Sequence, residues 1–153
     1  MSFDTRPGTR GSRQPGGRLL HWFNKFNARR IRRRGGGKFR GGDALVLRTI
    51  GRKSGAERAT PVAWFADADG NRLIVASAAG AAGNPAWYYN LAANPDQVRI
   101  EVAGEAIAVR AEQLHGAERA EAWERVTTAA PGFAEYQKQT DRELPIIRLV
   151  ERG

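Results

Sequence analysis

Two apolar runs separated by a short, glycine-bounded turn constrain this chain more than any other feature. The runs span residues 44–50 and 59–65, and both are rich in the β-branched and aliphatic side chains that favour strands. Gly51 and Gly55 bound the turn, where glycine permits backbone conformations that other residues avoid. The pattern therefore predicts an antiparallel hairpin.

The turn of this hairpin carries a group of hydrogen-bond donors. Arg52, Lys53 and Arg58 surround the Ser54 hydroxyl. Arginine offers a planar fork of donors and lysine a compact charge, so the group suits a phosphate or a polycarboxylate. A purely solvated surface turn has a similar composition, and the local sequence leaves that alternative open. The turn is not a nucleotide-binding P-loop, because the chain lacks the Gly-x-x-x-x-Gly-Lys-Ser/Thr pattern.

Basic residues gather near the N-terminus. Residues 1–42 hold 12 of the 25 Lys and Arg residues and a single acidic residue, Asp4, whereas the rest of the chain is close to neutral. A basic arm contacts nucleic acid only nonspecifically, because a specific interface needs a basic surface on the folded body. We expect residues 1–17, dense in Gly, Arg, Ser and Pro, to be disordered, and residues 35–153 to form one folded domain.

Residues 18–34 are predicted to form a short amphipathic basic helix. Its apolar stripe consists of Leu19, Trp22, Phe23 and Phe26, and arginine and lysine lie on the adjoining flank. Such a helix either lies at the inner face of the plasma membrane, with its aromatic side chains among the lipid headgroups, or packs on the body. The sequence contains no apolar segment long enough for a membrane span or a secretory signal, so a cytoplasmic location is expected.

The composition excludes several kinds of chemistry. The chain contains no cysteine, so disulfides, thiolate nucleophiles and cysteine-bound metals are ruled out. His21 and His115 stand too far apart in sequence to form a His-x-x-x-His pair on one helix. No metal site is therefore expected.

The remaining patterns predict a small, mainly β fold. A turn at 67–71 leads to a strand at 72–77, a second hairpin spans 98–110, and a final strand spans 146–150. A helix is predicted over 117–128. Its predicted inward positions are Ala120, Trp123 and Val126. Many short antiparallel strands with few helices indicate an α+β, mainly β chain that closes into a small antiparallel barrel with peripheral helices.

A second loop, rich in small residues, runs from Ser77 into a short helix. Asn84 is placed to cap this helix, and Pro85 to occupy its first position. Trp87 and Tyr88 either pack in the core or contact a ligand, and the sequence leaves both open. Because the amides at a helix N-terminus point outward, a flat or anionic group can lie against this loop.

Taken jointly, these motifs resemble the deazaflavin-dependent nitroreductase family over about residues 19–150. The family's first motif is Gly-Arg-Lys-Ser/Thr-Gly followed by Arg and Pro, and its second is Ala-Ser-Lys-Gly-Gly running to Asn-Pro-x-Trp-Tyr. Each motif alone is weak, but the ordered set at matching spacing is specific. The matching positions are 51–55, Arg58 and Pro61, then 76–88 with Asn90 and Leu91, then Tyr136, 140–142 and Pro145.

The resemblance implies a split β-barrel, similar to FMN-binding split barrels, that binds the 8-hydroxy-5-deazaflavin coenzyme F-420. The tail of this cofactor carries a phosphate and a polyglutamate chain, which gives the cationic turn an occupant. The reduced deazaflavin donates a hydride, while the protein fixes its ring and excludes water. FMN is the runner-up cofactor and haem a further alternative, since similar split barrels hold those ligands.

The resemblance also implies site residues. Ser77 is expected beside the cofactor ring, and Tyr136 on the acceptor side, where its hydroxyl can bind an acceptor oxygen or relay a proton. The expected acceptor-side residues are Ala130, Phe133 and Tyr136. The expected cofactor-binding residues are Arg52, Lys53, Ser54, Arg58, Thr60, Pro61, Ser77, Ala78, Ala79, Gly80, Asn84, Trp87 and Tyr88.

The chain departs from the family pattern at four of these positions. Ala78 stands where the family has lysine and Ala79 where it commonly has glycine, so one cofactor cation is missing. Ala130 and Phe133 stand where the family has tyrosines, which implies a wider and more apolar pocket. We therefore expect an oxidoreductase that transfers a hydride from the reduced coenzyme to a lipophilic or small acceptor, quinone-like or nitro. A noncatalytic, membrane-associated carrier remains the alternative, and no oligomeric state is predicted.

Overall fold

The structure is a computed structural model that describes residues 3–11, 38–39 and 42–152. The predicted amphipathic helix at 18–34 lies outside the described residues. Of the predicted disordered leader, residues 3–11 are described.

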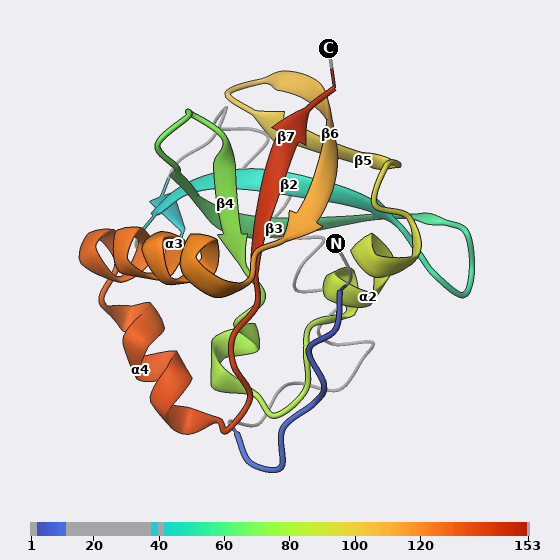
Figure 1. The fold of residues 1–153 in the computed structure, drawn as a ribbon. Coiled ribbons are helices and arrows are strands. Elements are labelled where there is room, and N and C mark those ends of the chain that lie inside the picture. Colours follow the sequence, from blue (N-terminus) through green and yellow to red (C-terminus); the bar gives the residue numbers. More distant parts are fainter. Residues whose placement is uncertain (1–2, 12–37, 40–41, 153) are drawn as a thin grey trace.

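Six antiparallel strands close into a barrel, as predicted (Figure 1). The barrel closes because β2 (Gly42–Ile50) pairs with β5 (Val98–Val102), which removes the exposed edges of the sheet. A two-residue strand, β1 (Lys38–Phe39), pairs with the start of β2. Around the barrel the strands are β2 (Gly42–Ile50), β3 (Glu57–Ala66), β4 (Arg72–Val75), β7 (Ile146–Glu151), β6 (Glu105–Gln113) and β5 (Val98–Val102).

The predicted first hairpin is confirmed as β2 and β3, which pair in register from Asp43 opposite Trp64 to Ile50 opposite Glu57. Pro61 sits in β3 opposite Val46, outside the short stretch where β3 also pairs with β4. A proline is tolerated there because its missing N–H breaks no bond to a second neighbour.

The interior of the barrel is filled with side chains. Aliphatic residues from all six strands form one buried cluster, and the helix α2 (Ala86–Ala93) adds Trp87, Tyr88 and Leu91 to it. The strand residues of this cluster include Leu45, Leu47, Ile74, Ile100, Val109 and Ile147. Since this interior is packed, it leaves no room for a ligand.

Two helices cover one outer wall of the barrel. The helix α3 (Gly116–Ala129) and the helix α4 (Gly132–Gln139) pack there over a second buried cluster (Figure 1). In β4 the side chains alternate, so that Leu73 and Val75 enter this outer cluster while Ile74 enters the interior one.

The prediction for the inward face of α3 is wrong at one position. Ala122 and Val126, four residues apart, are the buried positions, and Trp123 is partly buried beside them. Ala120 is exposed, because it lies off the stripe that these positions define.

Among the helices of the described residues, none is both long and apolar enough to cross a bilayer.

Residues 3–11, part of the leader for which disorder was predicted, lie against the body as an extended segment, here called the N-terminal strap. The ring of Phe3 meets that of Tyr88 edge to face, with centroids 5.6 Å apart. The Gly8 amide donates to the Ala82 carbonyl at 2.7 Å. Composition alone predicted disorder because it carries no information on such distant partners.

Candidate functional site

The cationic turn between β2 and β3 is held in one shape by its own backbone. The Gly51 amide donates to the Ala56 carbonyl at 2.7 Å, and the Gly55 amide to the Gly51 carbonyl at 2.8 Å. Gly55 has a φ of 72°, a left-handed conformation that favours glycine. The Ser54 Oγ accepts a hydrogen bond from the Ala56 amide at 3.1 Å. The side chains of the turn therefore project from a fixed frame.

The three cations of this turn are exposed and have no acidic partner in the part of the chain that the structure describes. Arg52, Lys53 and Arg58 form no ion pair with any described residue. The nearest acid along the chain, Glu57, is instead paired with Arg48 on the neighbouring strand. The charge of the turn is thus available to an anion from solution.

The helix α2 joins this turn to the second loop. The Asn90 Oδ1 accepts the Arg52 amide at 3.0 Å, and its Nδ2 donates to the Thr49 hydroxyl at 3.3 Å. The Arg52 guanidinium also lies over the Tyr89 ring, 4.7 Å from its centroid. Asn90 is buried, so one amide side chain fixes the base of the turn against the helix.

The second loop has an unusual backbone. Its single turn of 3₁₀-helix, η1 (Ala78–Gly80), follows the buried Ser77. Ala78 and Ala79 both have positive φ angles, 46° and 52°, and Gly80 has 82°. Left-handed alanine is costly, so this shape must be imposed by other parts of the molecule. A glycine at position 79, as in the family that the motifs resemble, would adopt this conformation without that cost.

A buried arginine imposes that shape. Arg142 is 3% exposed, and its guanidinium lies inside the curve of the second loop. Its Nη1 donates to the Ala76 carbonyl at 2.9 Å and to the Asn84 Oδ1 at 2.7 Å. Its Nη2 donates to the carbonyls of Ser77 and Ala81, both at 3.0 Å, and its Nε reaches the Ala81 carbonyl at 3.4 Å. All five donors of the guanidinium are therefore used.

This arginine has no carboxylate partner among the described residues. Burial lowers the pKa of the Arg142 guanidinium from its ordinary value. Arginine nevertheless stays protonated in proteins, so the loop oxygens stabilise a permanent positive charge. The loop and the arginine depend on each other.

The residues of the helix that follows have other roles than predicted. The cap of α2 is Pro85, and Asn84 makes no cap hydrogen bond. The Asn84 Nδ2 instead donates to the Thr5 carbonyl at 2.9 Å and to the Tyr89 hydroxyl at 3.3 Å. Since its Oδ1 accepts from Arg142, this side chain is committed to holding the loop and cannot cap the helix.

The structure places two predicted cofactor residues in the barrel core. Trp87 and Tyr88 are 7% and 1% exposed. The Tyr88 hydroxyl donates to the Gln113 Oε1 at 2.5 Å, and burial raises the pKa of this hydroxyl. Thr60 is half-buried and Pro61 buried in β3.

The structure brings the second loop and the predicted acceptor side together. A Cβ built on Gly80 would lie 2.9 Å from the Tyr136 carbonyl, so α4 packs directly on this glycine. Tyr136 is partly buried, and its ring meets that of Phe133 edge to face at 5.6 Å. Phe133 and Ala130 are buried in the outer cluster. Of the three predicted acceptor-side residues, Tyr136 therefore has the most solvent-accessible side chain.

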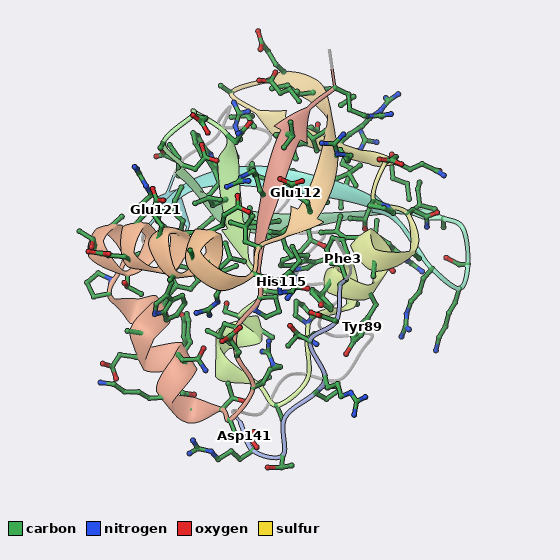
Figure 2. All side chains as sticks on the ribbon, viewed as in Figure 1. Phe3, Tyr89, Glu112, His115, Glu121 and Asp141 are labelled. Atoms are coloured by element: carbon green, nitrogen blue, oxygen red, sulfur yellow. The ribbon has the colours of Figure 1, made fainter. Side chains whose placement is uncertain are left out.

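The N-terminal strap lies along the second loop and is clamped at its far end by Asp141 (Figure 2). The Asp141 carboxylate accepts the Thr9 amide at 2.8 Å, the Thr9 hydroxyl at 2.6 Å and the Arg10 amide at 3.3 Å. The hydrogen bonds from Thr9 lower the pKa of this carboxyl to about 2. The clamp is therefore fully formed at neutral pH and is lost only as the pH falls toward that value.

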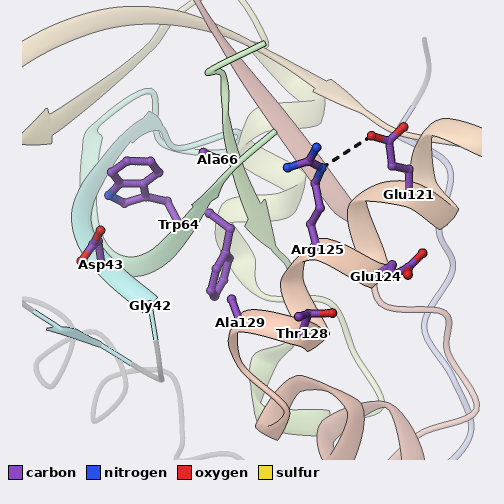
Figure 3. Close-up of a pocket in the computed structure, with 10 residues that line it drawn as sticks. Gly42, Asp43, Trp64, Ala66, Glu121, Glu124, Arg125, Thr128 and Ala129 are labelled. Atoms are coloured by element: carbon purple, nitrogen blue, oxygen red, sulfur yellow. Dashed lines mark ion pairs between the residues drawn. The ribbon is translucent and has the colours of Figure 1, made fainter. Parts of the chain in front are cut away.

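A separate cavity of about 800 Å³ lies between the C-terminal part of α3, from Glu121 to Ala129, and the strands β2 and β3 (Figure 3). Trp64 and Phe65 form its apolar wall, and an ion pair of 3.5 Å joins Arg125 to Glu121 beside it. None of the predicted acceptor residues lines this cavity. The ring of Phe65 meets that of Phe133 at 5.7 Å, so two successive aromatic contacts separate the cavity from Tyr136.

Sequence reasoning missed the residues that assemble the site. Asn90, Asp141 and Arg142 belonged to the matched motifs, but nothing local assigned them a role, and Thr9 carried no signal. Arginine side chains are usually exposed, so only the burial of Arg142 in the structure identifies it as the residue that holds the loop. In the part of the chain that the structure describes, no group of three or more His, Asp or Glu side chains is placed to hold a metal.

The chain is similar to known proteins in both sequence and fold. A family model described as F420H(2)-dependent quinone reductase matches residues 22–151. The F420H(2)-dependent quinone reductase Rv1261c of Mycobacterium tuberculosis is 38% identical over 112 residues, which cover 71% of this chain and 74% of that protein. A solved structure of an F420-H2 dependent reductase (FDR-A) superposes with a TM-score of 0.62 at 34% identity, covering 69% of this chain and 92% of that one.

A more distant structure shares the fold alone. A heme binding protein from Mycobacterium smegmatis superposes with a TM-score of 0.52 at 20% identity, covering 71% of this chain and 46% of that one. At this identity the likeness concerns the barrel and not the ligand.

The role of Arg142 can be tested by replacing it with a side chain of similar length that donates no hydrogen bond. Arg142→Met leaves the loop oxygens buried and unpaired, so we expect the free energy of unfolding to fall by about 2 to 5 kcal/mol. Amide hydrogen exchange in residues 77–82 should rise at the same time. Arg110→Met, at an exposed arginine of β6, is the matched control and should change stability by less than about 0.5 kcal/mol. Equal stability of the two variants would contradict the assignment.

Proposed function

Because this chain belongs to the F420H(2)-dependent quinone reductase family, an oxidoreductase family that uses reduced coenzyme F-420, we propose that its two loops hold the cofactor and that α4 borders the acceptor. Family membership confirms the resemblance that the ordered motifs indicated. The placement rests on the cationic turn. Its three exposed cations have no acidic partner among the described residues, and α2 joins the turn to the second loop.

The donor set of the turn fits the cofactor's anionic tail. A phosphate and several glutamate carboxylates are oxygen acceptors, and the turn offers two guanidinium groups and one ammonium from a fixed backbone. Lys53 and Arg58 are the principal partners in this proposal, with Arg52 and Ser54 beside them. Arg52 already stacks on Tyr89, which limits its reach and restrains its orientation.

The second loop fits the planar part of the cofactor. Its side chains from Ala78 to Gly80 are small, so a flat ring can approach the backbone closely. Ser77 and the backbone of 78–80 form the surface for the ring, and Arg142 fixes that surface. When bound in its reduced form, the cofactor supplies the hydride.

The acceptor side is proposed to be apolar with one hydroxyl. Ala130 and Phe133 lie buried behind Tyr136 in the outer cluster and keep its surroundings apolar. The Tyr136 hydroxyl hydrogen-bonds an acceptor oxygen and can provide the proton that a quinone takes up with a hydride. Exclusion of water by α4 protects this transfer. An apolar wall favours a lipophilic quinone over a polar nitro compound.

Cofactor titration and turnover test this function together. We expect coenzyme F-420 to bind more tightly than FMN or haem, and the reduced cofactor to be oxidised in the presence of menadione. Tight binding of FMN without binding of the deazaflavin would overturn the cofactor assignment for this chain. Binding without turnover across a panel of quinones and nitro compounds would favour a noncatalytic carrier.

Two substitutions test the cationic turn. Lys53→Ala and Arg58→Ala should each weaken cofactor binding by about 1 to 3 kcal/mol, because each removes a charge-assisted hydrogen bond to the tail. Arg110→Ala, which removes the same charge from an exposed site on another hairpin, serves as the control and should bind normally. If affinity is unchanged in both turn variants, the turn is only a solvated loop.

We also propose that the chain works in the cytoplasm, with peripheral contact to the inner face of the plasma membrane through residues 18–34. The support is the sequence pattern of that segment, whose Trp22, Phe23 and Phe26 accompany a basic flank, and the lipophilic nature of quinones. Changing these three aromatic residues to serine leaves the N-terminal strap in place. The change should abolish flotation with vesicles that contain anionic lipid, and equal flotation of the variant and the original protein would remove the proposal.

A further inference from the structure

The N-terminal strap lies on the proposed cofactor loop although it falls outside the family match. The match begins at residue 22, whereas the strap ends at residue 11. A Cβ built on Gly11 would lie 2.6 Å or less from the backbone of residues 80–82, so the strap and the loop are in close contact. This chain therefore has a wall beside its second loop that the matched region does not include.

The middle of the strap is fixed by three hydrogen bonds at one residue. The Thr5 amide donates to the Tyr88 hydroxyl at 3.0 Å, and its carbonyl accepts the Asn84 Nδ2 at 2.9 Å. Its hydroxyl accepts the Gln113 Nε2 at 2.8 Å. The next residue, Arg6, is exposed and precedes a proline, which restricts its backbone to extended conformations. Arg6 thus projects from a rigid base.

A short chain of contacts connects this base to the cationic turn. Asn84, which holds the Thr5 carbonyl, also donates to the Tyr89 hydroxyl at 3.3 Å. The ring of Tyr89 carries the Arg52 guanidinium at 4.7 Å. Figure 2 shows Tyr89 beside the strap, on the side that faces the β2–β3 hairpin. The strap and the turn thus approach Tyr89 from two sides.

The charge of Arg6 is not neutralised within the described chain. It forms no ion pair there, and the one acid of the strap, Asp4, instead faces His115 with 3.7 Å between Oδ1 and Nε2. Arg6 therefore extends the positive surface of the turn toward the second loop. Position 78 of that loop carries no charge, because alanine stands there.

We propose, on the basis of the function proposed above, that Arg6 is a further cofactor-binding residue, whose guanidinium binds the phosphate and glutamate carboxylates of the cofactor tail. In this role Arg6 supplies a cation that Ala78 cannot. The strap is then a third wall of the cofactor site, beside the cationic turn and the second loop. The Asp141 clamp and the Thr5 hydrogen bonds serve to hold that wall in position.

The test compares two arginines of the same strap and two forms of the ligand. Arg6→Ala is measured beside Arg10→Ala, which removes the same charge near the Asp141 clamp, at the other end of the strap. Binding is followed by deazaflavin fluorescence, with coenzyme F-420 and with the same ribityl deazaflavin lacking the phosphate and the glutamates. We expect Arg6→Ala to weaken binding of the complete cofactor about threefold to tenfold, with no effect on the tail-less form. Arg6→Lys should retain most of the affinity.

Several results would overturn this role of Arg6. Unchanged affinity in Arg6→Ala would show that the guanidinium does not reach the tail. An equal loss in Arg6→Ala and Arg10→Ala that vanishes at high salt would indicate long-range charge alone. An equal loss for both ligands would indicate that the substitution disturbs the loop. If the original protein fails to bind the complete cofactor, the proposed function itself fails, and this inference fails with it.

Discussion

The buried guanidinium of Arg142 is the interaction on which the rest of the site depends. Its five donors are all used on oxygens of the loop between residues 76 and 84. A loop built from alanine and glycine buries little apolar surface, so packing alone cannot hold it. A rigid planar fork of donors replaces the missing hydrophobic anchor. Two alanines keep a left-handed backbone because the arginine holds the carbonyls around them.

The neighbouring Asp141 extends this organisation to the N-terminus. The two residues are opposite in charge, yet each is committed to a different segment, Arg142 to the second loop and Asp141 to the strap. The end of α4, the second loop and the strap thereby become one unit on the wall of the barrel. The barrel contributes a platform whose filled interior leaves only its outside for a ligand. The helix α2 then joins this unit to the cationic turn through Asn90 and Tyr89.

The chemistry of a deazaflavin enzyme asks little of protein nucleophiles, and this chain has no cysteine. In the proposed function, the protein contributes the charged turn that binds the cofactor tail and the rigid second loop that receives the cofactor ring. The turn of the long hairpin carries the exposed cations, whereas α3 and α4 pack their apolar faces on the outer cluster. In the proposed function the anionic tail and the lipophilic acceptor therefore use different surfaces.

The sequence by itself determined the two hairpins, the class of barrel, the cationic turn and the family. These follow from local signals, namely strand alternation, glycines such as Gly55 at left-handed positions, and ordered motifs. Only the tertiary structure decided that the strap is ordered, that Asn84 binds an arginine instead of capping a helix, and that Arg142 is buried. The partners in these contacts are 132 residues apart for Thr9 and Asp141 and 66 apart for Arg142 and Ala76. Local patterns cannot specify such pairs, because the hydrogen bonds exist only once the barrel has brought distant segments together.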